Sequence, residues 1–486
     1  MLKRGAPEAV EGPPSKKHAP AAELNDQQHR FSERVRAQSH VLLTGGAGTG
    51  KSYALKQAVD SDKPGVYVTA MTGAAATLLE MNASTLHSFL GMGPVTPPKR
   101  AADFRAKVQE FLSNGDKNRY AIQRLRAAKT LVIDEVSMMS AGMFLLLDHV
   151  LRAVRKSPQP FGGVQQIMVG DFMQLDPVVK EIDDSKQTTL FGADEALQKD
   201  LDCDYVFQTE LFKTSFKAIC NLTKPMRHAS DPTFFALCSR LRFGQHTPED
   251  IALLNARILP PPDQTPTVYS HRATVAEHNA RELAKLPGKT VTYKCETDVC
   301  SILKTGAIVR ARSHRVSDKV VQMLSDQLIK SGAFDQTLEL KVGAWVMHLK
   351  NFSNEKLCNG TLGVIIGFDE KGDPIFQYER DGVKTTKTLK REAWTKSVSP
   401  HQCVAVWQYP VCLAYAVTIH KIQGATLDRM YVDVSRAFAN GQVYTAITRI
   451  RGLDCLYLSA PFPAQVRVSR EAAKFYEDLE KAELAI

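Results

Sequence analysis

Short apolar runs alternate with amphipathic helical patterns through the first half of the chain. The first of these runs lie at residues 41–43, 66–68, 131–133 and 166–169. A second series begins near residue 216 and includes residues 267–269, 340–349, 411–419, 430–432 and 455–458. Apolar runs that alternate with helices are typical of parallel sheets covered by helices. The pattern therefore predicts an α/β fold with two parallel-sheet domains in tandem.

Two stretches interrupt this alternation. Residues 92–129 begin with several prolines and continue into a strongly charged segment, which predicts a small insertion in the first domain, a possible wedge. Asn359-Gly360 precedes an alternating run at residues 361–368, and Asn-Gly beside such a run indicates a β-hairpin. We therefore expect a small β-barrel to be inserted in the second domain.

These patterns divide the chain into segments. They are a disordered basic arm at 1–23, a first α/β domain at 24–215, a second α/β domain formed by 216–350 and 410–465, a β-barrel insertion at 351–409 and a C-terminal helix at 466–486. A length of 486 residues suits several cores, because single hydrophobic cores stop growing at roughly 250–300 residues.

The composition is that of a globular protein with a basic surplus. Hydrophobic residues make up 44% and charged residues 23% of the chain, so most of it should fold. Lys and Arg outnumber Asp and Glu by 62 to 52, which gives a net charge of +10 and a pI near 9.0. This charge suits a polyanion such as nucleic acid but does not identify one.

Cysteine usage and hydropathy argue against two further classes of protein. The nine cysteines form no CxxC pair and no Cys/His cluster at zinc spacing, which indicates a reducing compartment. The longest apolar stretch, 404–419, is interrupted by Gln408 and Pro410 and is shorter than the roughly 20 residues that span a bilayer. We therefore expect neither a zinc protein nor a membrane protein.

The N-terminal arm carries two basic clusters. Lys3-Arg4 and residues 15–18 resemble a two-part nuclear import signal, although a solvated basic tail explains them equally well. The arm also contains acidic residues, which disfavour a mitochondrial presequence. We expect a nuclear protein, with the mitochondrion as the alternative.

A glycine-rich loop follows the first predicted strand and precedes a helical run. It has the pattern GxxxxGK[ST] in the residues Gly45, Gly46, Ala47, Gly48, Thr49, Gly50, Lys51 and Ser52. Glycines let backbone N–H groups curl around phosphates, and the following helix adds its positive dipole. Lys51 would neutralise charge that develops on the γ-phosphate, and the Ser52 hydroxyl would bind Mg²⁺. The loop predicts an ATP site.

Two carboxylates follow the strand at residues 131–133. Asp134 would hold Mg²⁺ and Glu135 would polarise the attacking water, the two tasks that hydrolysis requires in addition to binding. An Asp-Glu pair after a strand is by itself more often a helix N-cap. Beside a phosphate loop, the pair favours an ATPase.

Further motifs are spread over most of the chain. In the first half they lie at residues 68–76, 85–89, 134–138, 160–165 and 170–175, and in the second half at 340–344, 359–363, 418–424 and 444–449. These motifs resemble those of the Pif-type (petite integration frequency) DNA helicases of superfamily 1B. The resemblance covers residues 24–460 and implies two RecA-like domains, with an SH3-like barrel inserted in the second.

The resemblance also implies roles for individual residues around the nucleotide. Gln28 would read the adenine edge, although with Asn25 it also fits a helix capping box. Gln174 would sense the γ-phosphate. Arg227 and Arg449 would reach the γ-phosphate from the second domain, so that hydrolysis requires the cleft to close.

The DNA path follows from the resemblance alone. It implies that Thr72, His87, His420 and Lys421 line a groove that crosses both domains. We expect Phe89 to be a core residue. Superfamily 1B membership implies movement from 5′ to 3′. Departures from the family pattern near this path, at Ile422 and Ala425, would affect step efficiency or substrate preference.

The sequence thus predicts a monomeric ATP-dependent DNA helicase that acts in replication, repair, recombination or telomere maintenance. Its partners would be single-stranded DNA, duplex junctions and replication or repair proteins. One alternative is a DNA-stimulated ATPase that remodels protein–DNA complexes without processive unwinding. A P-loop kinase or GTPase is more remote, because it gives Arg449 no role. A catalytically silent subunit conflicts with the intact Lys51, Asp134 and Glu135.

Overall fold

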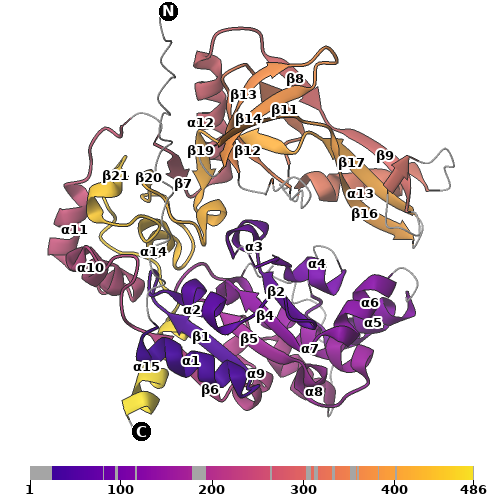
Figure 1. Cartoon of the computed structure of the whole chain (residues 1–486), viewed down its shortest axis with the longest axis vertical. Helices are drawn as coiled ribbons and strands as arrows, with labels where there is room; N and C mark the ends of the chain where they lie inside the picture. Colours follow the sequence, from indigo (N-terminus) through magenta and orange to yellow (C-terminus); the bar gives the residue numbers. More distant parts are fainter. Residues whose placement is uncertain are drawn as a thin grey trace, which may run out of the picture.

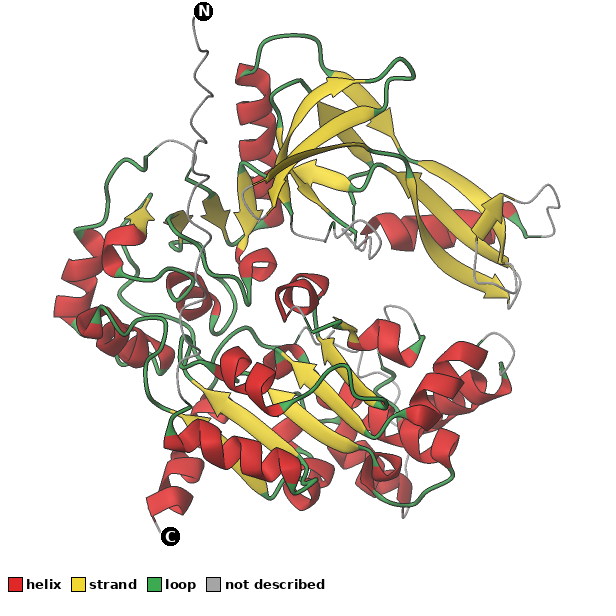
Figure 2. Ribbon diagram, viewed as in Figure 1, coloured by secondary structure: helices red, strands yellow, loops and turns green. Residues whose placement is uncertain are grey.

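The computed structural model describes residues 24–484 with short gaps. The gaps are residue 80 and residues 93–96, 115–117, 178–192, 263–264, 303–307, 311–315, 331–333, 351–356, 358–360, 381–382 and 400–401. The predicted N-terminal arm and the Asn359-Gly360 turn lie outside the described residues. Figures 1 and 2 show an α/β unit below, a smaller one beside it, and a group of β-sheets above both.

A six-stranded parallel sheet forms the centre of the first domain. Its order is β3-β2-β4-β5-β1-β6, with the bounds β1 Val41–Gly45, β2 Val66–Ala70, β3 Ser84–Thr85, β4 Thr130–Asp134, β5 Gln165–Val169 and β6 Ala218–Leu222. Strands β1, β4 and β5 are buried along their whole length, as expected for central strands covered on both faces.

The predicted end of the first domain at residue 215 is wrong. Strand β6 lies beyond that boundary, yet it pairs in parallel with β1, from Val41 with Ala218 to Gly45 with Leu222. An apolar run does not show which sheet it joins, so the pattern assigned this strand to the second domain. The first domain therefore extends to Leu222.

Helices cover both faces of this sheet. They are α1 Asp26–Arg36, α2 Lys51–Ala58, α3 Gly73–Leu79, α4 Leu86–Leu90, α7 Ala141–Arg155, α8 Ala193–Leu201 and α9 Glu210–Ser215. The predicted insertion at 92–129 contains two further helices, α5 Ala101–Ser113 and α6 Arg119–Ala127. Their buried residues Phe104, Phe111 and Leu125 belong to the same hydrophobic core as α7. These helices are thus packed parts of the first domain.

A smaller parallel sheet forms the second domain. Its order is β19-β7-β20-β21, with the bounds β7 Thr267–Tyr269, β19 Ala416–Thr418, β20 Met430–Asp433 and β21 Leu456–Leu458. The helices of this domain are α10 Pro232–Arg242, α11 Pro248–Asn255, α12 Arg272–Lys285 and α14 Gln442–Ile447. A short 3₁₀ helix, η5 Ile419–Ile422, follows β19 directly. Two parallel sheets in tandem confirm the predicted fold class.

The β insertion is larger than the predicted segment 351–409. Antiparallel strands run from Val291 to Leu413, so residues 340–349 belong to the insertion, although the pattern assigned them to the second domain. The strands are β8 Val291–Lys294, β9 Glu296–Ile302, β10 Ile308–Arg310, β11 Thr337–Leu340, β12 Trp345–His348, β13 Leu362–Phe368, β14 Pro374–Arg380, β15 Val383–Thr388, β16 Glu392–Ser399, β17 Gln402–Gln408 and β18 Val411–Leu413.

Three antiparallel sheets with one helix make up this insertion. Their orders are β10-β9-β17-β16, β11-β8 and β15-β14-β13-β12-β18, and α13 Asp318–Lys330 lies against β16 and β17. A separate hydrophobic cluster, which includes Leu340, Val346 and Phe376, fills the five-stranded part. The insertion therefore has a core of its own.

The last helix, α15 Arg470–Leu484, returns to the first domain, and Figure 1 shows it beside α1. Its Phe475 stacks on Phe207, with ring centroids 4.7 Å apart, and meets Phe172 edge-on. None of the helices in the described part of the chain is both long and apolar enough to cross a membrane.

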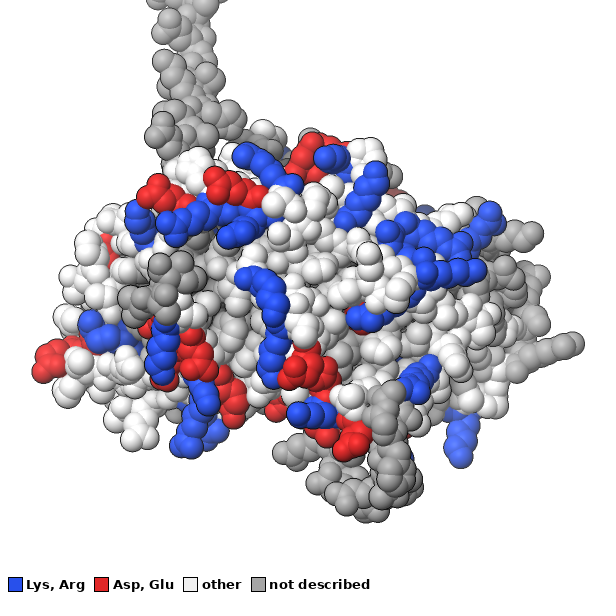
Figure 3. All heavy atoms as spheres, turned by 90° about the horizontal axis from the view of Figure 1, so that it is seen from below, with Lys and Arg blue, Asp and Glu red and all other residues white. Residues whose placement is uncertain are grey.

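The basic surplus is spread over the surface visible from below. Lys and Arg intermingle with Asp and Glu across much of this face, and a group of basic side chains gathers toward one edge (Figure 3). A mixed pattern of this kind is ordinary for a soluble domain. The net charge therefore does not mark a nucleic-acid path on this face.

Candidate nucleotide site

The glycine-rich loop lies between β1 and α2, at the carboxyl edge of the first sheet. Gly48 and Gly50 have φ angles of +79° and +86°, a left-handed conformation that glycine adopts without strain. The ammonium group of Lys51 donates hydrogen bonds to the carbonyl oxygens of Gly45 and Gly46, at 2.9 and 3.0 Å. Burial lowers the pKa of Lys51 to about 8. A half-buried cation in a glycine-rich loop at the start of a helix suits a phosphate.

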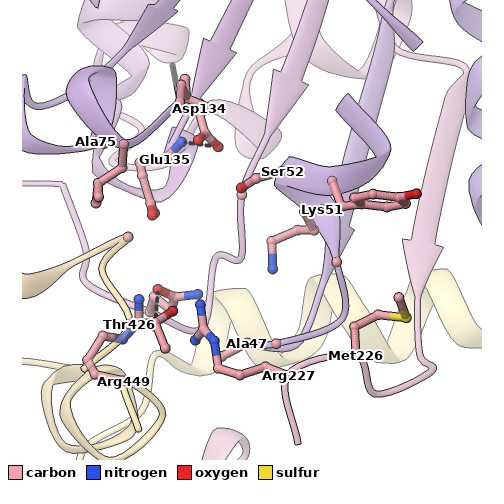
Figure 4. A pocket seen from close by; sticks show the side chains of 18 residues that line it. Ala47, Lys51, Ser52, Ala75, Asp134, Glu135, Met226, Arg227, Thr426 and Arg449 are labelled. Carbon is pink, nitrogen blue, oxygen red and sulfur yellow. Dashed lines mark hydrogen bonds between the residues drawn. The ribbon is translucent and has the colours of Figure 1, made fainter. Parts of the chain in front are cut away.

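One pocket joins this loop to both domains (Figure 4). Its first-domain walls include Ala47, Gly48, Gly50, Lys51, Ser52, Asp134, Glu135 and Gln174. Its remaining walls include Met226, Arg227, Gly424, Thr426 and Arg449. The structure therefore brings together most residues that the sequence predicts for nucleotide binding. Gly45, Gly46 and Thr49 belong to the loop but not to the pocket wall.

The two carboxylates stand where β4 ends. Burial and the neighbouring Glu135 raise the pKa of Asp134 to about 7. Glu135 has a φ of +55°, an unusual conformation for a residue with a side chain and one that recurs at functional sites. Its backbone N–H donates to Asp134 Oδ1 at 2.9 Å. The Ser52 hydroxyl and the Asp134 carboxylate line the same pocket, and they are oxygen ligands of the kind that Mg²⁺ prefers.

Two arginines line the opposite wall. Arg449 donates from Nη2 to Gln174 Oε1 at 3.1 Å, and Arg227 donates from Nη1 to the Thr448 carbonyl at 2.9 Å. Burial, with Arg449 next to it, lowers the pKa of Arg227 to about 10. Figure 4 shows Arg227 and Arg449 on the side of the pocket away from Asp134 and Glu135. Two guanidinium groups across from a phosphate loop can stabilise negative charge between them.

Gln28 lies at the edge of this site, outside the pocket wall. The capping box is present, since Gln28 Oε1 accepts from the Asn25 N–H at 3.1 Å. The Nε2 group of the same side chain is buried and has no hydrogen-bond partner in the described part of the chain. A Cβ on Gly50 would lie 3.0 Å from it. A buried donor beside the phosphate loop is compatible with adenine recognition as well.

A buried polar cluster beneath the loop was not predicted. Asp171 is fully buried and accepts from Arg242 at 2.8 and 3.1 Å and from the Tyr444 hydroxyl at 3.0 Å. The Tyr444 hydroxyl also accepts from the Ala47 N–H at 2.7 Å. Tyr476 of α15 donates to Asp171 at 3.3 Å. The cluster therefore connects the phosphate loop with helices α10, α14 and α15.

Only the position of Asp171 in the motif at 170–175 gave a signal for this cluster. Burial alone would raise the pKa of Asp171, but the charges of Arg242 and Lys51 outweigh it and hold that pKa below its usual value. Arg242 also lies over the Tyr476 ring, 4.2 Å from its centroid. The negative charge of the buried Asp171 is thus balanced by the positive charges of Arg242 and Lys51.

The predicted DNA contacts lie outside the nucleotide pocket. Thr72 accepts a hydrogen bond from the Ala75 N–H at the start of α3, and His87 lies in α4. His420 and Lys421 lie in η5, where Lys421 is exposed and its ammonium group is 3.4 Å from Cys412 Sγ. Phe89 is buried in the core, as predicted. Among the described residues, no three His, Cys, Asp or Glu side chains gather as a metal site.

The fold and the pocket define a P-loop protein with two RecA-like domains that share one nucleotide site. Residues 23–232 match the family model described as PIF1-like helicase, and residues 324–368 match the model of the DNA helicase Pif1 2B domain. The chain belongs to the PIF1-like helicase family. The second match falls within the antiparallel insertion.

Similar proteins of known name are Pif1 helicases as well. The chain is 32% identical over 468 residues to the human ATP-dependent DNA helicase PIF1, a match that covers 94% of this chain and 64% of the human protein. It is 29% identical over 461 residues to ATP-dependent DNA helicase Pif1 of Bdellovibrio bacteriovorus, covering 94% and 92%. The chain thus spans just under two thirds of the human relative's length.

Solved structures share the architecture. Pif1 helicase from Candida albicans superposes with a TM-score of 0.76 at 27% identity, over 95% of this chain and 99% of that one. Bacteroides Pif1 bound to single-stranded DNA gives a TM-score of 0.70 at 26% identity, over 95% and 98%. A structure of Pif1 helicase from Bacteroides with ADP-AlF₃ and single-stranded DNA is also similar, with a TM-score of 0.70 at 26% identity.

Proposed function

We propose that this chain is an ATP-dependent DNA helicase that moves 5′ to 3′ on single-stranded DNA and unwinds duplex. One observation supports this most directly: Lys51, Asp134 and Glu135 face Arg227 and Arg449 across a single pocket. Groups that bind, activate and neutralise a triphosphate are thus divided between two domains. Hydrolysis then depends on how the domains close, which is what a motor requires.

Each group has a task in phosphoryl transfer. Lys51 and the loop N–H groups bind the β- and γ-phosphates, and Glu135 orients and polarises the attacking water. Arg227 and Arg449 stabilise charge on the transferred group, and Gln174 positions Arg449, to which it is hydrogen-bonded. Ser52 and Asp134 would hold Mg²⁺, which neutralises charge on the β- and γ-oxygens when bound.

Single-stranded DNA is the proposed track. Thr72 and His87 would contact it from the first domain, and His420 and Lys421 from the second. Related structures support this substrate, since Bacteroides Pif1 was solved with single-stranded DNA and another structure concerns unwinding of forked duplex by two coordinating Pif1 helicases. Contacts in both domains would let the grip alternate as the pocket opens and closes.

Duplexes with one single-stranded tail test the proposal. Purified protein with Mg²⁺ and ATP should separate a 5′-tailed duplex and leave a 3′-tailed one intact. Lys51→Ala should reduce unwinding at least about 100-fold, because it removes the positive charge that neutralises the γ-phosphate. Equal activity on both tails would refute the polarity. ATP hydrolysis stimulated by DNA without strand separation would identify a remodelling motor, and hydrolysis indifferent to DNA would refute a DNA motor.

We propose further that the protein acts as a monomer in the nucleus, where replication or repair proteins would be its partners. The two basic clusters of the N-terminal arm support nuclear import, and the single-chain pocket supports a monomer. A fluorescent fusion with and without residues 1–23 tests the first point: mitochondrial signal from the full chain would refute it. Sedimentation of the protein with a tailed duplex tests the second.

A further inference from the structure

Gln423 touches the carboxylate that would activate water. Its Nε2 group donates to Glu135 Oε2 at 2.9 Å and lies 3.5 Å from the Ser137 hydroxyl. Gln423 is 1% exposed and Glu135 is 9% exposed, so water screens this contact little. Glu135 belongs to the first domain and Gln423 to the second. The hydrogen bond thus crosses the interface at a catalytic group.

The backbone around both residues is arranged for this approach. Glu135 has its left-handed φ of +55°, and Gly424 has a φ of +80°. A Cβ on Gly424 would lie 3.2 Å from Glu135 Oε1, which is closer than side chains normally pack. The segment therefore lies directly against the Glu135 carboxylate, with Gln423 on one oxygen and Gly424 beside the other.

Gln423 also follows directly on the proposed DNA contacts. His420 and Lys421 belong to η5, whose Ile419 and Ile422 are buried in the core. The Ala425 N–H donates to the Ile422 carbonyl at 3.0 Å, which continues the turn past Gln423. A displacement of His420 or Lys421 by a DNA strand would therefore move the Gln423 amide as part of one stiff segment.

Only the Nε2 end of the Gln423 amide has a hydrogen-bond partner among the described residues. Its Oε1 atom is buried and has no hydrogen-bond partner in the described part of the chain, although its Nε2 group is bonded. Buried polar atoms without partners are rare in folded proteins and call for an explanation. An acceptor oxygen beside Glu135 can accept a hydrogen bond from the water that Glu135 polarises.

We propose that Gln423 is a positioning residue that couples DNA binding to ATP hydrolysis by orienting Glu135. This proposal rests on the helicase function proposed above and names the route by which the track would control the active site. When a DNA strand binds His420 and Lys421, the segment that contains them holds the Gln423 amide in place. The amide then orients the Glu135 carboxylate toward the attacking water. ATP binding itself does not depend on Gln423.

Steady-state ATP hydrolysis with and without oligo(dT) tests this role. Gln423→Ala should lower the DNA-stimulated kcat about 10- to 100-fold, the rate equivalent of one hydrogen bond to a charged group. The ratio of stimulated to unstimulated rate should fall toward unity. The KM for ATP and the affinity for labelled oligo(dT), measured by anisotropy, should change less than about twofold. Gln336→Ala, at an exposed glutamine of the insertion, is the matched control.

Gln423→Glu separates positioning from a structural role. The isosteric variant keeps the packing but sets a second carboxylate beside Glu135. That carboxylate cannot donate a hydrogen bond to Glu135, so the DNA-stimulated kcat should fall as far as in Gln423→Ala, while the KM for ATP should change less than about twofold. A merely structural residue would instead lower the folded fraction measured by circular dichroism and would reduce the stimulated and unstimulated rates alike.

The outcomes distinguish the two proposals. Wild-type protein whose hydrolysis ignores oligo(dT) would refute the proposed function and this inference with it. Wild-type protein that is stimulated, beside a Gln423→Ala variant stimulated to the same extent, would refute only the inference. A folded Gln423→Glu variant that oligo(dT) stimulates as strongly as the wild type would refute it as well.

Discussion

Replacing Arg242 by Met should unpair a buried carboxylate. Asp171 is fully buried and receives two hydrogen bonds from Arg242, at 2.8 and 3.1 Å. Removing one partner of a buried ion pair costs about 3–5 kcal/mol, because the other charge stays buried. Asp171 would keep the hydrogen bonds from Tyr444, Tyr476 and the Met173 N–H. We therefore expect a cost of about 3 kcal/mol, at the lower end of that range.

The same substitution should reverse the way in which the contribution of Asp171 to stability depends on pH. In the wild type the pKa of Asp171 lies below its usual value, so its contribution to stability is present above about pH 4 and is lost as pH falls through the folded-state pKa. Without Arg242, burial dominates and raises that pKa above its unfolded value. The contribution of Asp171 in Arg242→Met would then be lost as pH rises.

Hydrogen exchange of residues 165–175 measures the local stability around Asp171 and its pH dependence. A local measurement is suitable because the domains of this protein need not unfold together. Arg242→Lys keeps the charge and should keep the wild-type pH dependence. Arg242→Met combined with Asp171→Asn removes the unpaired charge and should recover more than half of the loss. A loss below about 1 kcal/mol in Arg242→Met, or protection that increases with pH, would refute the argument.

Three further substitutions or conditions have expected outcomes. Gly441→Ala should lower the melting temperature and kcat together, since its Cβ would lie 2.1 Å from the Gln174 carbonyl oxygen. Gly367→Ala should change little, because its Cβ would make only an ordinary contact, 3.8 Å from Ile375 Cδ1, and Gly367 has no positive φ. Mg²⁺ affinity measured by titration calorimetry should fall below pH 7, because Asp134 has a pKa of about 7 and must be ionised to bind the metal. Tyr476→Phe should cost about 1–3 kcal/mol of unfolding free energy in denaturant titrations, by leaving buried polar groups of the first domain without a partner.

The sequence predicted the parts of the site whose chemistry depends on adjacent residues. The loop at 45–52 was recognisable because N–H groups that enclose phosphates require glycines at fixed spacing before Lys51 and Ser52. Asp134 and Glu135 follow their strand directly. Arg227 and Arg449 were placed by family resemblance, since a lone arginine carries no local signal of its target.

Contacts between distant segments could not be predicted in this way. Asp171, Arg242 and Tyr476 lie far apart in the chain, and only folding brings them together. Strand β6 resembles any short apolar run, so periodicity did not reveal which sheet it joins. The limits of the insertion were missed for the same reason, because an apolar strand in an antiparallel sheet and one in a parallel sheet can have the same pattern.

The buried cluster and the Gln423 contact place different constraints on domain closure. Tyr444 bonds both Asp171 and the Ala47 N–H, and it lies in the same short helix that leads to Arg449. A large separation of the domains at this point would break several buried hydrogen bonds at once, at about 1–3 kcal/mol each. We therefore expect closure to turn about the Asp171 cluster, with the larger movement at Gln423. Hydrogen exchange with and without a non-hydrolysable ATP analogue should then change at residues 419–426 and stay constant at 170–175; the opposite pattern would place the pivot at the DNA-contact segment instead.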